Sequence, residues 1–553
     1  MDTQRLILFI IFGFSLVMLW EAWQRDHRPV LPPSAISVVP ATPEAAPGAR
    51  QGATLPAGGA GAAAVPPAAP AVKGEMVRVQ TDRVIAEINT VGATLSRLEL
   101  LRHKDSEDPN KDFVLIGPAH EYEAQSGLTG PEGPNHRTLW HAEPGERTLK
   151  PGQESLVVRF SAQNGEGLKV EKTYTFHRDS YVVDVTLTVQ NKSAAPVSSF
   201  AYFQLTHDGK PDGEHTGIAA SFGARSFTGF ALYSEQHKFQ KVPPADVDKN
   251  KAEYVHQADD GWLAFVQHYF VSAWLPASGA QREYAIEKRP DGTYAGRAVL
   301  PLRVAAGATG SITVPLYAGP QEKSRLEAAA PGFDLVVDYG WLTIIAWPLF
   351  WLLQKLHGLT DNWGVAIILL TVLIKLIFFP LSAASYKSMA KMKLITPRLT
   401  KLREMYANDR QKMNQAMMEL YRTEKINPLG GCFPIVVQIP VFIALYWVLL
   451  ASIELRHAPF ILWIKDLSAL DPYFVLPILM TGTMVLQTRM NPKPPDPVQA
   501  KVMQFMPFIF SIFFFFFPAG LVLYWLVNNI LSILQQWQIQ RLFNRDKPAH
   551  ARR

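Results

Sequence analysis

The chain has 553 residues, of which 48% are hydrophobic and only 18% are charged, a charged fraction that is low for a soluble protein. Its 54 Lys and Arg residues against 48 Asp and Glu residues give a formal net charge of +6, which is too mild for a nucleic-acid-binding surface spread over the whole chain, so no DNA partner is expected. A single cysteine, Cys432, excludes an intrachain disulfide framework and a cysteine-based zinc or iron–sulfur site.

The chain begins with an apolar segment, residues 6–23, in which Glu21 is the charged residue. A helix of this length nearly matches the hydrocarbon core of a bilayer. A cleavable signal peptide is the alternative, but no A-x-A-like cleavage site follows, and Trp20 and Trp23 suit the membrane interface. We therefore expect residues 1–28 to form an uncleaved transmembrane anchor.

The next segment, residues 29–73, is dominated by Pro, Ala and Gly. Such a composition buries too little apolar area to offset the entropy lost on ordering. These residues are predicted to be a disordered linker.

Residues 74–335 change to a period-two alternation of apolar and polar side chains. Leu156, Val158 and Phe160 illustrate it, and so does the run of alternate apolar residues from Tyr181 to Val189. Turn signals separate many short segments of this kind. The pattern predicts antiparallel strands that form one large two-sheet β-sandwich.

A second apolar region follows the predicted sandwich. Residues 340–358 mix aromatic and aliphatic side chains around Pro348 and end near Lys355, which favours an amphipathic helix in the membrane interface over a span. Residues 359–540 then contain five better spans, and with the anchor we expect six. The five predicted spans cover residues 363–381, 431–453, 472–487, 502–517 and 521–538.

The charges between the spans predict the topology. Residues 382–430 hold ten basic and four acidic residues, whereas residues 454–471 hold two basic and three acidic ones, so the first segment is predicted to be cytoplasmic and the second to lie on the other side. The basic tail, residues 541–553, agrees with a cytoplasmic C-terminus. An even number of spans then places the N-terminus inside and residues 29–340 in the periplasm.

Lys375 is the ionisable residue that lies well inside a predicted span, and Thr371 is one helical turn before it on the same face. No predicted span has an Asp, Glu or His in its interior, which disfavours a proton- or cation-coupled transporter. Lys375 could simply extend past Pro380 to the cytoplasmic surface. Alternatively, it faces a water-filled recess that attracts acidic or polar segments.

Polar side chains on other predicted spans could line the same recess. Each of them alone is explained by a hydrogen bond between helices, but together they favour a groove. Asn529 and Ser532 belong to this set of polar residues. The candidate groove residues are Lys375, Thr371, Gln438, Tyr524, Trp525 and Asn528.

The cytoplasmic segment 382–428 has the pattern of two amphipathic helices interrupted near Asn408 and Asp409. Flexible thioethers beside lysines form an adaptable surface for varied apolar peptides, although they could equally hold the two helices together. If this hairpin captures clients, the residues expected to do so are Met389, Met392, Met405, Met413 and Met417.

Motifs for enzymatic chemistry are missing from the sequence. There is no G-x-S-x-G, no phosphate-binding loop and no H-E-x-x-H, because His120-Glu121 lacks the second histidine four residues after the first. We expect no catalytic activity, no cofactor and no metal. A sugar-active enzyme built on the β-domain remains an alternative that turnover assays would test.

Four motifs in the second half resemble the YidC family of membrane protein insertases. They are N-P-L-G-G-C-F-P at 427–434 followed by Q-I-P at 438–440, A-P-F at 458–460 with Trp463 and D-L-S at 466–468, and F-P-A-G-L-V-L-Y at 517–524. The resemblance covers the anchor, the β-domain and all later spans. It implies a Gram-negative inner-membrane protein with a periplasmic β-supersandwich similar to sugar-mutarotase folds, an interfacial helix and a five-helix insertase core.

The resemblance also implies a mechanism and partners. A hydrophilic groove, open to the cytoplasm and lipid but closed to the periplasm, would admit polar parts of a client, and a mobile cytoplasmic hairpin would receive it. The implied partners are nascent inner-membrane proteins, the Sec translocon with its accessory subunits, the ribosome and the lipid bilayer. The family usually carries an arginine in the groove, where this chain has Lys375, so the positive charge is kept but the planar fork of donors is not.

Overall fold

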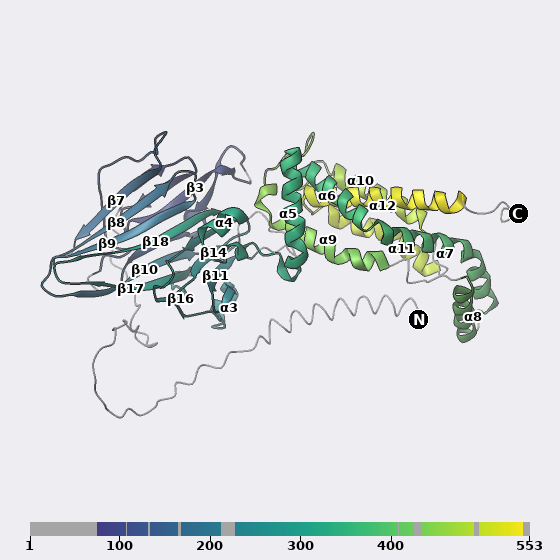
Figure 1. Cartoon of the computed structure of the whole chain (residues 1–553), viewed down its shortest axis with the longest axis horizontal. Coiled ribbons are helices and arrows are strands. Elements are labelled where there is room, and N and C mark those ends of the chain that lie inside the picture. The colour runs from purple at the N-terminus through teal and green to yellow at the C-terminus, as the bar shows by residue number, and fades with distance from the viewer. Residues whose placement is uncertain are drawn as a thin grey trace, which may run out of the picture. The chain divides into compact units, whose positions relative to one another are not determined.

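The computed structural model describes residues 74–106, 108–130, 133–163, 167–211, 227–406, 409–424, 433–491 and 497–545. The predicted anchor, the linker and the last eight residues lie outside these ranges. Two parts follow one another along the described chain: a β-rich part from β1 (Met76–Gln80) to β18 (Thr309–Pro320), and a helical part from α5 (Thr343–Thr360) to α12 (Ala519–Arg545) (Figure 1).

The β-rich part consists of two antiparallel sheets, with nine strands each among the described residues. The first has the order β1-β2-β3-β5-β10-β17-β16-β13, with β4 paired to β3, and the second has the order β12-β11-β14-β15-β18-β9-β8-β7-β6. The other strands of the first sheet are β2 (Val84–Asn89), β3 (Thr94–Lys104), β4 (Asp112–Ile116), β5 (Glu123–Leu128), β10 (Val197–His207), β13 (Gln257–Ala258), β16 (Arg282–Lys288) and β17 (Tyr294–Val304). The second sheet comprises β6 (His141–Ala142), β7 (Ser155–Gln163), β8 (Leu168–His177), β9 (Val182–Asn191), β11 (Gly229–Ser234), β12 (Lys238–Val242), β14 (Trp262–Val266), β15 (Phe270–Trp274) and β18.

The alternation of side chains in the sequence explains this sandwich. Leu156, Val158 and Phe160 of β7 are buried while their neighbours are not, because successive residues of a strand point to opposite faces. The buried residues of both sheets form one apolar core. The predicted two-sheet β-sandwich is therefore confirmed.

The side chain of Arg282, the first residue of β16, is completely buried and holds two loops together. All five of its donor bonds go to backbone carbonyls, so its charge is solvated by peptide dipoles. Nη1 donates to the carbonyls of Gly261 and Pro276 (both 2.9 Å), Nη2 to those of Asp259 (2.9 Å) and Ala277 (2.5 Å), and Nε to that of Ala280 (2.9 Å).

Lys172 of β8 is a second buried cation in the sandwich. Its Nζ donates to the carbonyls of Gly92 (2.6 Å) and Ser126 (2.7 Å), and it lies 4.9 Å from the ring centre of Trp140. Burial away from water lowers the pKa of Lys172 from 10.5 to about 7. The neutral amine of Lys172 can still donate the hydrogen bonds to Gly92 and Ser126.

This lowered pKa predicts that the β-sandwich becomes more stable with rising pH. Between pH 7 and 10.5 the unfolded chain holds a proton on Lys172 that the folded chain has released, so the free energy of unfolding increases over this range. We expect the stability difference between the wild type and Lys172→Met to shift in favour of the wild type from pH 6 to pH 9. Urea unfolding of the full-length proteins measures this difference, and an unchanged difference would contradict the prediction.

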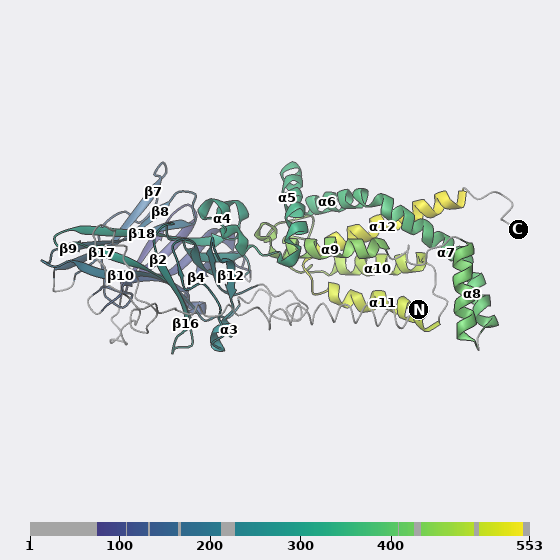
Figure 2. The same ribbon diagram turned by 60° about the horizontal axis from the view of Figure 1, so that its bottom comes forward.

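The helical part is built around a second apolar core. Its remaining helices are α6 (Trp363–Ile377), α7 (Phe379–Met405), α8 (Arg410–Thr423), α9 (Phe433–Ala451), α10 (Val475–Met490) and α11 (Pro497–Phe514). Figure 1 and Figure 2 both draw α5 across the direction of α6, α9 and α12. One face of α5 packs into this core, where Phe350 and Leu353 are buried, and its other face exposes the large apolar side chains of Ile344, Trp347 and Trp351.

The chain bends by 67° between α6 and α7. Pro380 is the second residue of α7 and has no N–H to donate to the preceding turn, which explains why the first helix ends here. The helix therefore ends at Ile377, four residues before the predicted end of the span, and the hairpin helix α7 begins at Phe379 rather than at residue 382. By length and hydropathy, no single helix of the described residues meets the criterion for a membrane span, whereas the bent pair of α6 and α7 meets it.

Candidate functional site

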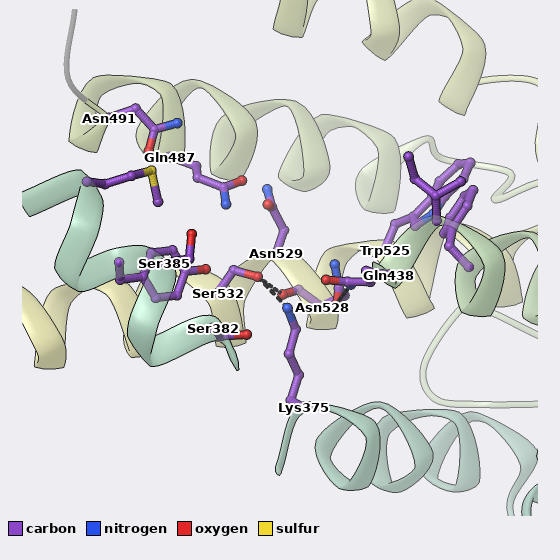
Figure 3. Close-up of a pocket in the computed structure, with 14 residues that line it drawn as sticks. Lys375, Ser382, Ser385, Gln438, Gln487, Asn491, Trp525, Asn528, Asn529 and Ser532 are labelled. Atoms are coloured by element: carbon purple, nitrogen blue, oxygen red, sulfur yellow. Dashed lines mark hydrogen bonds between the residues drawn. The ribbon is translucent and has the colours of Figure 1, made fainter. Parts of the chain in front are cut away.

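A pocket of about 360 Å³ lies among five helices of the helical part, and we call it the polar pocket. Helices α6, α7, α9, α10 and α12 contribute to its wall. Its lining combines one cation, many hydroxyl and amide groups, and a few apolar side chains (Figure 3). The lining residues are Lys375, Ser382, Ser385, Tyr386, Met389, Gln438, Ile439, Phe442, Gln487, Asn491, Trp525, Asn528, Asn529 and Ser532.

Lys375 extends from α6 into the polar pocket toward α12 (Figure 3). Its Nζ donates a hydrogen bond of 2.7 Å to Oγ of Ser532, and the residue is only 6% exposed. None of the ion pairs found among the described residues involves Lys375. Within the described part of the chain, the ammonium group of Lys375 therefore donates to a neutral hydroxyl and not to a carboxylate.

Amide and hydroxyl groups continue from Lys375 along α12. Ser532 donates from Oγ to the carbonyl of Asn528 (2.7 Å), and Gln438 of α9 donates from Nε2 to Oδ1 of Asn528 (2.8 Å). On the other side, Asn529 donates from Nδ2 to Oγ1 of Thr483 on α10 (3.0 Å). The polar side chains predicted from three separate segments thus meet in one place, where they both bond to each other and line the pocket.

Two of the predicted groove residues lie elsewhere. Thr371 is 1% exposed, and its hydroxyl donates to the carbonyl of Ile367 in its own helix (2.7 Å). Tyr524 is also 1% exposed and packs in the apolar core with Phe442. Neither belongs to the pocket lining. Lys375, Gln438, Trp525 and Asn528 do belong to it.

Several residues that line the polar pocket were not predicted from the sequence. Ser382 and Ser385 line the pocket from α7 because the bend after α6 turns this helix back over the pocket, so two serines assigned to the hairpin reach the site. Gln487 and Asn491 line it from the end of α10, and Asn491 accepts a hydrogen bond from Gln536 (3.0 Å). Their sequence signal was that polar residues occur at or just after the end of the predicted span 472–487.

The methionines assigned to the hairpin have different environments. Met389 lines the polar pocket. Met392 and Met417 pack against Ile395 and Leu399 between α7 and α8, as expected for residues that hold the two helices together. Met405 is 70% exposed, and Met413 is partly exposed.

The outer surface beside the polar pocket is apolar. Large exposed side chains cover α10 and α11, an arrangement that is unfavourable in water and typical of a lipid-facing or partner-facing surface. The side chains concerned are Ile478, Leu479, Leu486, Val502, Phe505, Phe508, Ile509, Phe510 and Ile512.

Two family models match the chain, one for each part. The YidC periplasmic domain matches residues 76–352, and the 60Kd inner membrane protein matches residues 355–547.

Curated relatives match nearly the full length. The chain is 51% identical over 555 residues to a membrane protein insertase YidC of Aromatoleum aromaticum, covering 99% of both chains. It is 51% identical over 567 residues to that of Methylobacillus flagellatus, covering 100% of both, and 52% identical over 560 residues to that of Cupriavidus necator, covering 99% of both.

Two solved structures show more distant likeness. An active YidC insertase with its first transmembrane domain resolved matches with a TM-score of 0.39 and 18% identity, covering 84% of this chain and 93% of that one. A galactose mutarotase-related enzyme from Lactobacillus acidophilus has a TM-score of 0.30 and 9% identity, covering 44% and 97%.

Proposed function

The chain belongs to the YidC family of membrane protein insertases, and we propose that it inserts clients by accepting their hydrophilic segments into the polar pocket. The observation that carries this proposal is the buried ammonium group of Lys375 among hydroxyl and amide groups, without a described carboxylate partner. Burying a charged side chain inside a membrane protein costs free energy, so such a residue usually serves a function.

The pocket would lower the energetic barrier for a hydrophilic client segment in the bilayer. A polar peptide loses hydrogen bonds to water on entering hydrocarbon, and each unsatisfied group costs several kcal/mol. In the polar pocket, Gln438, Asn528 and Ser532 offer the client hydrogen bonds in place of those it loses to water, and Lys375 attracts acidic side chains.

Burial of the client's apolar helix in lipid would drive the reaction. Transfer of apolar surface out of water is favourable by about 25 cal/mol per Å², so a full span supplies a large driving force without a nucleotide. We propose that this helix moves along the apolar surface of α10 and α11 while its polar flank occupies the polar pocket.

The membrane arrangement is part of the proposal. We place the protein in the cell inner membrane with six spans, both termini in the cytoplasm, and residues 29–340 in the periplasm. The charge distribution around the hairpin supports this orientation. The exposed tryptophans of α5 support an interfacial position for that helix.

The partners are proposed from the family membership. They are nascent inner-membrane proteins, the Sec translocon with its accessory subunits and the ribosome.

Reconstitution of the pure protein tests the proposed function. Liposomes containing it should insert a small single-span client with an acidic translocated segment, scored as protection of that segment from added protease. Empty liposomes control for spontaneous insertion. Equal protection in both preparations would contradict an autonomous insertase.

The β-sandwich is expected to be dispensable for this reaction. All residues of the polar pocket follow Gly340 in the sequence, and the predicted linker transmits little mechanical force. A deletion of residues 75–318 that retains α5 should therefore insert the client at a rate within about twofold of the full-length protein in the same assay. Loss of insertion by a stably folded deletion protein would contradict this.

The hairpin of α7 and α8 is proposed to capture clients before they reach the polar pocket. Its net positive charge attracts acidic clients, Met405 exposes its side chain to them, and Met413 is partly exposed. Photocrosslinkers at these two positions should trap a nascent client earlier than a crosslinker at Asn528. Met392, which packs between the two helices, is the matched control position. Clients that never contact position 405 or position 413 would leave the hairpin a structural role.

A further inference from the structure

Two histidines and one aspartate meet at one end of the first sheet. His120 ends the short helix η1 (Pro118–His120), whereas His207 is the last residue of β10 and Asp208 follows it. Among the described residues these three form a group of metal-ligating side chains whose ligand atoms all lie within 4.8 Å of one another.

The distances in this group suit a tetrahedral metal ion. Nδ1 of His120 and Nδ1 of His207 each lie 3.2 Å from the same Oδ1 of Asp208. Zinc binds imidazole nitrogen and carboxylate oxygen at 2.0–2.2 Å, so neighbouring ligands of a tetrahedral ion are about 3.3 Å apart.

The surrounding structure holds the three side chains in position. The backbone N–H of Asp208 donates to the carbonyl of His120 (2.9 Å), which joins the two segments directly. The ring of His207 is fully buried and stacks on the ring of Phe265, with 4.1 Å between the ring centres. The ring of His120 lies parallel to that of His207, with 5.2 Å between their centres. His120 and Asp208 retain 27% and 16% side-chain exposure, which leaves a path for an ion.

Three neighbouring groups already interact with the proposed ligands. The N–H of Gly209 donates to Nδ1 of His207 (2.9 Å), and that of Lys210 donates to Oδ1 of Asp208 (3.0 Å). The first bond indicates that Nδ1 of His207 carries a lone pair, as a metal ligand requires, but the ion must displace this bond. Nζ of Lys210 lies 3.5 Å from the other carboxylate oxygen, Oδ2.

We propose that His120, His207 and Asp208 form a binding site for a divalent transition metal of the zinc class. Two imidazoles and one carboxylate are a ligand set that zinc accepts, with water in the fourth position. The ion would join η1 to the end of β10, two segments that the chain separates by more than 80 residues. The site belongs to the β-rich part and shares no residue with the polar pocket.

Metal binding by the tag-free full-length protein in detergent tests the proposal. After treatment with a chelator, the protein is dialysed against Zn²⁺, and the metal content per chain is measured. The variants are His120→Ala and Asp208→Asn. The matched control is His177→Ala. Nε2 of His177 lies 2.8 Å from a carboxylate oxygen of Asp184, but these two residues do not belong to the metal-ligating group found among the described residues.

We expect one zinc ion per wild-type chain and per His177→Ala chain, and at least about tenfold weaker binding in both cluster variants. Zinc should also raise the melting temperature of the wild type and the control, but not that of the cluster variants, because a ligand stabilises the state that binds it. Wild-type protein that binds no zinc, or cluster variants that bind it with unchanged affinity, would overturn the proposal.

Discussion

Lys375→Ala is expected to slow the insertion of clients with acidic translocated segments by at least about tenfold in liposomes. A unit charge ~4 Å from a carboxylate contributes about 4 kcal/mol at an effective dielectric constant near 20. A tenfold change in rate requires only about 1.4 kcal/mol of this. Lys375→Arg should retain activity because it preserves the cation, which is the element that the proposal requires.

Two controls separate the pocket charge from other effects. Lys465→Ala removes a positive charge from an exposed position between α9 and α10, outside both the polar pocket and the hairpin, and should insert clients normally. A client with an uncharged translocated segment should be affected much less by Lys375→Ala. Normal insertion of acidic clients by Lys375→Ala, at equal protein levels, would show that Lys375 has no role in insertion.

Arg282→Met is expected to destabilise the β-sandwich by about 4 kcal/mol. The substitution leaves four carbonyl acceptors in two loops without their described donor, whereas that of Asp259 keeps a hydrogen bond from the N–H of Gly279 (2.7 Å). Each group that loses its partner costs about 1 kcal/mol or more. Lysine at this position would keep the charge but could satisfy only three acceptors. Proteolysis of full-length protein across a urea series measures the unfolding midpoint of the β-domain.

The exposed Arg303 of β17 provides the matched variant, since Arg303→Met removes the same side chain without leaving buried carbonyls. Equal urea midpoints for the two variants would show that the Arg282 bonds contribute little. If the β-sandwich is dispensable for insertion, Arg282→Met should still insert clients in liposomes at temperatures where the helical part stays folded.

Much of the fold follows from side-chain periodicity. The alternation in residues 155–163 and 182–191 was sufficient to predict the strands β7 and β9, because burying one face of a strand requires that pattern. The end of α6 was placed too late because residues 378–381 are as apolar as the helix before them. The bend at this point depends on Pro380 and on packing against α12, which hydropathy does not report.

The polar pocket could be predicted only in part for a similar reason. Gln438 and Asn528 are amides in otherwise apolar segments, which is a strong local signal. Thr371 shares the face of Lys375, but a threonine hydroxyl in a helix can bond to its own backbone, and it does so here. The contributions of Ser382 and Ser385 depend on the direction of α7 after the bend.

The group of His120, His207 and Asp208 had no signal in the sequence. His120-Glu121 lacks the helical spacing of a metalloprotease motif, and the second histidine comes from a distant strand. Only the pairing of β10 with β5 brings the two segments together.

During insertion, we expect the hydrophilic segment of a client to enter the polar pocket while its apolar helix stays outside. Photocrosslinkers at Asn528, which lines the pocket, and at Ile530, which is exposed on the same helix, test it directly during insertion into liposomes. We expect position 528 to capture the translocated polar segment and position 530 to capture the apolar helix or lipid. Capture of the polar segment at position 530 with equal or greater yield would show that this segment does not pass through the polar pocket.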